Sequence, residues 1–70
     1  MAAILNGWFT VDTVVALKAL DANLYQATMT FIVVREVNKA FRLDGTSGQP
    51  EDLTRGIVNT NNGAFQWFLF

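Results

Sequence analysis

The segment from Leu17 to Phe41 carries the longest hydrophobic pattern in the chain, and it constrains the fold more than any other feature. Apolar residues recur there at heptad spacing, which is typical of a helix that packs against another helix. All the a and d positions except Asn38 are apolar; they are Leu17, Leu20, Leu24, Ala27, Phe31, Val34, Asn38 and Phe41.

The flanking residues favour the same interpretation. Thr10 is placed to cap a helix, and Gly45 stands where a left-handed residue would end one. Asp12 lies near the start, and Lys39 and Arg42 lie near the end, as the helix dipole prefers. We therefore predict a long, amphipathic, coiled-coil-like helix over about residues 11–43.

A strand is the alternative for part of this segment. From Tyr25 to Val33 the residues alternate with a period of two, and the stretch is rich in strand-favouring Thr, Phe, Ile and Val. The helix would then end near Asp21-Ala22-Asn23 and be followed by mostly antiparallel β-structure. Whether Thr28–Val34 is helix or strand stays open at this point.

The last part of the chain predicts a β-hairpin over about residues 56–70. Asn62-Gly63 is a strong signal for a type I′ turn, in which both central residues have positive φ. The final strand is apolar on both faces, so we expect both of its faces to be buried. With an apolar arm at 1–10 and a polar loop at 44–55, the prediction is a small α+β protein with a single domain, residues 1–70.

Composition limits how such a chain is stabilised. The chain has 70 residues, of which 51% are hydrophobic and 16% charged, with a formal net charge of −1. It has no cysteine, so it forms no disulfide. It has no histidine either, which is the commonest metal ligand and the commonest general base in proteins. Small domains without such supports usually rely on association with another chain. We therefore expect an oligomer.

The remaining polar residues give little support for catalysis or ligand binding. No acids are spaced as a catalytic or metal-binding pair, and Gly45–Gly48 lacks the lysine of a phosphate-binding loop. We predict no enzyme activity, no cofactor, no metal and no small-molecule substrate. Arg35, Lys39 and Arg42 would share one face of the predicted helix and could contact an anion or an acidic partner. This footprint is small for nucleic acid, and none is expected.

No segment predicts export or a membrane span. Ala22–Val34 is free of charge but short and interrupted by polar residues, and the first residues lack a basic signal-peptide region. The sequence thus favours a cytoplasmic assembly or a virion.

These observations predict a structural subunit of a larger homo- or hetero-oligomeric assembly, such as a virion component, filament or scaffold piece. Its partners would be copies of itself or larger protein subunits. One alternative is a small accessory subunit docked on a membrane protein complex, with membrane contact at the C-terminus. Another is a binding module that uses the basic residues. The predicted interface consists of Trp8, Phe9, Leu24, Phe31, Val34, Phe65, Trp67, Phe68 and Phe70.

Overall fold

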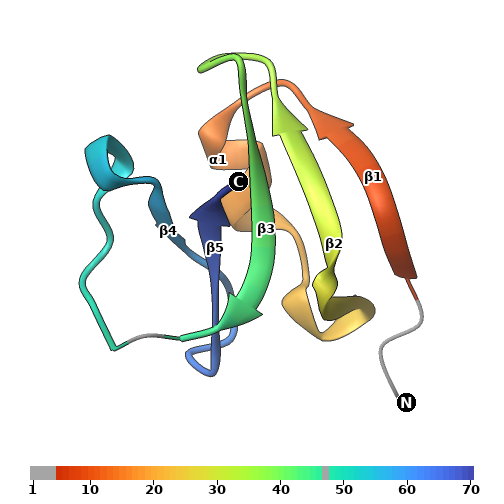
Figure 1. The fold of residues 1–70 in the computed structure, drawn as a ribbon, viewed down its shortest axis with the longest axis vertical. Coiled ribbons are helices and arrows are strands. Elements are labelled where there is room, and N and C mark those ends of the chain that lie inside the picture. The colour runs from red at the N-terminus through yellow and green to blue at the C-terminus, as the bar shows by residue number, and fades with distance from the viewer. Residues whose placement is uncertain (1–4, 47) are drawn as a thin grey trace.

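The computed structural model describes residues 5–46 and 48–70, which form a mixed β-sheet with a short α-helix packed on one face (Figure 1). The strand order is β1-β2-β3-β5-β4. Figure 1 shows α1 behind the sheet, and we call the opposite side the open face. The elements are β1 (Leu5–Val11), α1 (Val14–Ala19), η1 (Ala22–Leu24), β2 (Tyr25–Val34), β3 (Lys39–Gly45), η2 (Leu53–Arg55), β4 (Ile57–Asn59) and β5 (Phe65–Leu69).

The predicted coiled-coil-like helix over 11–43 is wrong, and so is the α+β fold built on it. In the described residues the α-helix covers Val14–Ala19 alone. Thr13 caps the start of this helix, and its hydroxyl oxygen accepts a hydrogen bond from the backbone N–H of Ala16 at 3.0 Å. Leu20 caps its end with an extended backbone. From Thr28 to Val34 five of the seven residues are β-branched, and such residues lose less side-chain freedom in a strand than in a helix.

The hairpin turn between β2 and β3 gives a second reason why the predicted helix over 11–43 does not form. Asn38, the polar member of the predicted helical seam, has a φ of 54°. Its backbone N–H donates to the carbonyl of Arg35 at 3.1 Å and closes the turn. Asn adopts this left-handed conformation more readily than most residues. A strand that is apolar on both faces, followed by such a turn, therefore produces heptad spacing without a helix.

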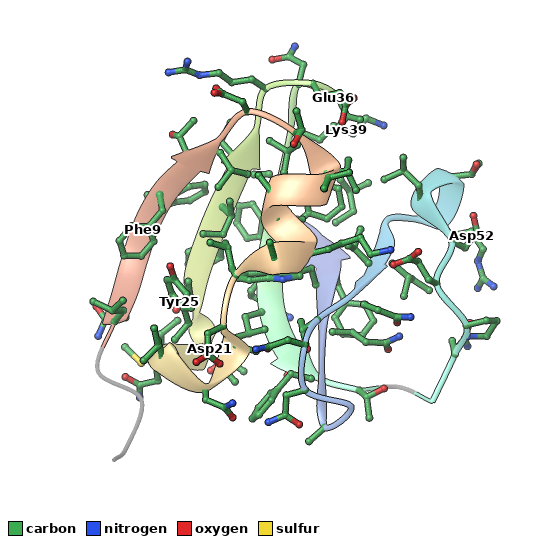
Figure 2. All side chains as sticks on the ribbon, turned by 180° about the vertical axis from the view of Figure 1, so that it is seen from behind. Phe9, Asp21, Tyr25, Glu36, Lys39 and Asp52 are labelled. Atoms are coloured by element: carbon green, nitrogen blue, oxygen red, sulfur yellow. The ribbon has the colours of Figure 1, made fainter. Side chains whose placement is uncertain are left out.

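Three of the four strand pairings are antiparallel, as in the predicted alternative, but β1 and β2 run parallel, so the sheet is mixed. The connection between β1 and β2 passes through α1, which covers one face of the sheet, and through η1 at the start of β2 (Figure 2). The segment predicted as an apolar arm, 1–10, contributes residues 5–10 to β1; residues 1–4 lie outside the described part. The predicted loop 44–55 likewise includes the end of β3 and the whole of η2.

A bulge in β2 decides which residues face the helix. Leu5 of β1 pairs with Tyr25, whereas Gly7 pairs with Thr30, so β2 carries extra residues between these two positions. Thr28 within the bulge has a φ of 67°, a conformation that β-branched residues rarely adopt. The Thr30 hydroxyl donates to a carbonyl inside the bulge, that of Gln26, at 2.9 Å. A bulge changes the alternation of a strand between the two faces of its sheet.

After the bulge, Ile32 and Val34 are buried on the helix side, and Phe31 and Val33 are turned to the open face. Before the bulge, Tyr25 packs against the core on the helix side, where it contacts Phe9 with ring centroids 5.6 Å apart. Figure 2 shows both of these rings on that side of β1 and β2.

The core lies between the sheet and α1. Its buried side chains are Leu17, Ala22, Ile32, Val34, Phe41, Leu43, Val58 and Trp67. Trp67 fills its centre with 0% exposure, and its indole Nε1 has no acceptor among the described residues. Trp67 therefore stabilises the core through packing volume and not through a hydrogen bond.

The turn between β4 and β5 is not of the predicted type I′, because neither Asn62 nor Gly63 has a positive φ. The side-chain oxygen of Asn62 instead accepts a hydrogen bond from the N–H of Ala64 at 2.9 Å. The hydroxyl of Thr60 donates to the carbonyl of Asn62 at 2.7 Å. Side-chain hydrogen bonds thus shape this turn in place of left-handed backbone.

Among the described residues, no helix has both the length and the apolar character that a membrane-spanning helix requires.

Candidate functional site: an aromatic cluster on the open face

A row of side chains crosses the open face from one end of the sheet to the other. The strand registers place Trp8 beside Phe31, Phe31 beside Arg42, and Arg42 beside Phe68. Ile57 of β4 pairs with Phe68 and completes the row. Alternation along each strand explains this arrangement, because the sequence neighbours of these residues point into the core. The row is largely apolar, with a single cation at its middle.

Three aromatic rings at one end of the row form a contiguous cluster, which we call the aromatic cluster. Trp8 and Phe31 are stacked, with centroids 4.6 Å apart and an interplanar angle of 16°. Phe70 meets Phe31 edge to face at 4.9 Å and Trp8 at 5.7 Å. Ala40 pairs with Val33, and its carbonyl accepts a hydrogen bond from the Phe70 N–H. A small side chain at position 40 leaves room for Phe70 to reach the other two rings.

The aromatic cluster is exposed to solvent although its rings contact one another. Trp8 is 59% exposed and Phe70 is 67% exposed, whereas Phe31 beneath them is half-buried. Offset-stacked and edge-to-face pairs hold aromatic rings in fixed relative positions. The cluster therefore presents a pre-ordered apolar surface, with two large side chains that a partner could cover.

The cation in the row is held by a neighbour on its own strand. A guanidinium nitrogen of Arg42 lies 3.2 Å from a carboxylate oxygen of Asp44, and both side chains are partly exposed. Residues two apart on a strand share a face, so this ion pair also lies on the open face. Asp44 thereby offsets the charge of Arg42, and the row carries little net charge.

The predicted interface residues separate into groups in the structure. Trp8, Phe31, Phe68 and Phe70 lie together on the open face. Phe9 and Phe65 pack against the core from the helix side, where Val34 and Trp67 are fully buried. Leu24 lies in η1 and is exposed. Sequence reasoning assigned these residues to one class because it had no information on which face each of them occupies.

The predicted basic face does not exist as a helical surface. Arg35 lies in the turn after β2 and pairs with Asp12 at 3.3 Å, where both side chains are strongly exposed. Lys39 begins β3 and pairs in register with Val34, which places it on the helix side of the sheet. Arg42 lies on the open face. Helical spacing predicted that these three cations share one face, whereas the turn and the alternation along β3 place them apart.

A hollow of about 310 Å³ lies beside the β4–β5 turn, away from the aromatic cluster, and is lined mainly by polar side chains including Thr46, Asn59 and Gln66. The Gln66 amide nitrogen donates to the carbonyl of Gln49 and to the side-chain oxygen of Asn59, both at 2.9 Å. Its oxygen accepts from the Thr46 hydroxyl at 3.0 Å. These contacts tie the loop after β3 to the hairpin. No group of three or more potential metal ligands occurs among residues 5–46 and 48–70.

Two carboxylates with lowered pKa also serve as ties between elements. Hydrogen bonds from the Asn61 side chain and the Asn23 backbone lower the pKa of Asp21, which follows α1 (Figure 2). The backbone N–H of Asn59 and the ammonium group of Lys18 lower the pKa of Glu51. The two Glu51 oxygens contact these groups at 3.0 Å and 2.9 Å. Glu51 thus links β4 to α1.

Comparisons of the chain with protein-family models, with curated proteins and with solved structures returned no match. The geometry of the described residues therefore carries the functional argument.

Proposed function

We propose that this protein is a non-enzymatic structural subunit of a larger protein assembly and that the open face is its contact surface. The observation that carries the proposal is the exposed aromatic cluster of Trp8, Phe31 and Phe70. Clustered exposed apolar side chains mark interaction surfaces, whereas single exposed ones are common on any protein. Aromatic residues are also enriched at the centres of protein interfaces.

The magnitudes favour the aromatic cluster over the charged residues as the source of binding energy. Burying a large apolar side chain contributes about 1.5–3 kcal/mol. An exposed ion pair such as Arg35–Asp12 contributes about 0–1 kcal/mol. Trp8 and Phe70 are already partly buried, but covering both of them still contributes more than one such ion pair.

Charge supports a protein partner over a nucleic acid. Aromatic residues on an open sheet face can stack on unpaired bases, but such sites are combined with a positively charged surface. This chain has a formal net charge of −1 and a pI of about 4.9. Asp44 offsets the cation of the row, Arg42. The open face thus lacks the electrostatic attraction on which binding to phosphate groups depends.

The experiment is a comparison of self-association by light scattering over a range of concentrations. The test variant is Trp8→Ser combined with Phe70→Ser, which removes the exposed rings and leaves the buried core unchanged. We expect the wild-type chain to associate as concentration rises and the double variant to remain monomeric.

Val15→Ser is the matched control, because Val15 is 76% exposed on α1 and also loses an apolar side chain in the change. This control should associate like the wild-type chain. A wild-type chain that stays monomeric throughout would contradict the proposal, as would a double variant that associates as strongly as the wild type. Repeating the series in mild detergent distinguishes a protein contact from a membrane-associated role. In the membrane-associated role, detergent and not a second protein would cover the aromatic cluster.

A further inference from the structure

The two outer edges of the sheet differ in how their backbone groups are satisfied. At the β4 edge, Asp52 exchanges two backbone hydrogen bonds with Ile57, each at 2.9 Å. The N–H of Asn59, the next outward-pointing residue, donates to a carboxylate oxygen of Glu51 at 3.0 Å. The segment before η2 therefore closes this edge against another strand.

The β1 edge is open in the described part of the chain. β1 stands at the end of the strand order, and no strand within residues 5–46 or 48–70 pairs with its outer side. The Val11 carbonyl accepts from the Arg35 N–H on the β2 side. Because backbone groups alternate along the regular part of the strand, from Gly7 to Val11, the N–H and C=O groups of Trp8 and Thr10 point outward. Leu5–Val11 contains no charge and no proline, the usual means of protecting an edge.

We infer that β1 pairs antiparallel with β1 of a second copy of this chain, which joins two sheets into one around a two-fold axis. This inference rests on the proposed function and names a second copy of this chain as a partner, joined at the sheet edge beside Trp8 and not across the open face. With one open edge and one closed edge in the described residues, pairing between two β1 edges uses up the open edges and leaves the open face for the contact proposed above. The result is a closed dimer, because a filament would need a second open edge on each copy.

The aromatic cluster favours one register of this pairing. In that register Trp8 lies opposite Trp8 of the second copy. Trp8 lies on the open face together with Phe31 and Phe70, so the two aromatic clusters become neighbours across the axis. Since β1 is uncharged, the pairing brings no like charges together along the strands.

The test replaces the outward N–H of Thr10 and leaves the aromatic rings in place. Thr10→Pro removes this donor at two symmetric positions of the dimer and places a ring against the partner strand. Proline is tolerated on an edge strand where its nitrogen faces solvent. We expect the dissociation constant, measured by sedimentation, to rise about tenfold or more. The matched control Thr10→Val keeps the N–H and the branched side chain, and it should dimerise like the wild type.

Amide hydrogen exchange on the wild-type protein is the second readout and does not depend on whether the proline variant folds. The amides of Trp8 and Thr10 should exchange more slowly in the concentrated than in the dilute sample, while the exposed amide of Val15 stays unchanged. Equal exchange at both concentrations would overturn the inference. If the Trp8/Phe70 serine variant is monomeric but Thr10→Pro still dimerises, the pairing fails and the proposed function stands. If the wild-type chain never associates, both fail.

Discussion

The indole of Trp8 stacks on the ring of Phe31, with centroids 4.6 Å apart, across the parallel ladder between β1 and β2. These residues are partners in register, so the sheet itself sets the geometry of the aromatic pair. Phe31 is half-buried and supports the more exposed indole above it. Any change that shifts the register between β1 and β2 should therefore disturb the surface on which the proposed function depends.

The bulge in β2 sets that register, and its strained residue is Thr28, with a φ of 67°. Left-handed backbone costs a β-branched residue about 1–2 kcal/mol, whereas Asn accepts it more readily. Thr28→Asn should therefore raise the free energy of unfolding by about 0.5–1 kcal/mol, measured by urea denaturation. The same change at Thr10, which lacks a positive φ, should give no gain. An unchanged or lower stability of Thr28→Asn would show that the bulge is not strained.

Gly56 is the second position where backbone geometry restricts the side chain. Its φ is 75°, and a Cβ at this position would overlap the side chain of Leu69 on β5. Gly56→Ala should lower the free energy of unfolding by at least about 2 kcal/mol, through left-handed strain and this overlap together. Gly63→Ala is the control, because Gly63 lacks a positive φ and a Cβ there meets open space. Equal thermal stability of the two variants would contradict the described position of β5.

Acid should destabilise the protein in part through Glu51. Its pKa lies below the ordinary value of 4.5 in the folded state, because the Asn59 N–H and Lys18 stabilise the carboxylate. The unfolded chain therefore binds more protons in this range, and stability falls as the pH drops from about 4.5 through the lowered pKa.

Glu51→Gln removes this titration. Its stability in urea should be lower than that of the wild type near neutral pH, and it should change less as the pH falls below about 4.5. The same acid dependence in the wild type and in Glu51→Gln would contradict the assigned role. Asp21, with a lowered pKa of its own, contributes in the same direction and remains in both proteins.

The sequence contains the strand signals that the structure follows, but heptad spacing competes with them. The alternation over Tyr25–Val33 indicates a strand, and β2 occupies this stretch. The alternation of residues could not show that the bulge at Thr28 exchanges which residues of β2 lie on the helix side and which on the open face, because the bulge depends on pairing with β1. The parallel pairing itself brings together Trp8 and Phe31, which are far apart in sequence, and no local pattern encodes that contact.

The candidate site was therefore predictable by residue type and not by arrangement. The excess of aromatic residues near both ends of the chain pointed to Trp8, Phe68 and Phe70 as contact residues. Their sequence positions did not reveal that their neighbour Trp67 is buried in the core and that Phe9 packs against the core from the helix side. Tertiary packing decides which face of the sheet each strand residue occupies, and a shift of the strand by one residue moves every side chain to the opposite face.

The two tryptophans provide the most direct measurement of the central claim, that the aromatic cluster is covered by protein on assembly. Trp67→Phe removes the buried indole, which has no hydrogen-bond acceptor among the described residues, and leaves Trp8 as the fluorophore. Circular dichroism with a strand-type spectrum, as for the wild type, verifies the fold of this variant. Acrylamide quenching of Trp8 is then measured in dilute and concentrated samples. We expect strong quenching of Trp8 in the dilute sample, and weak quenching with a blue-shifted emission in the concentrated sample. Strong quenching of Trp8 at every concentration would contradict the central claim.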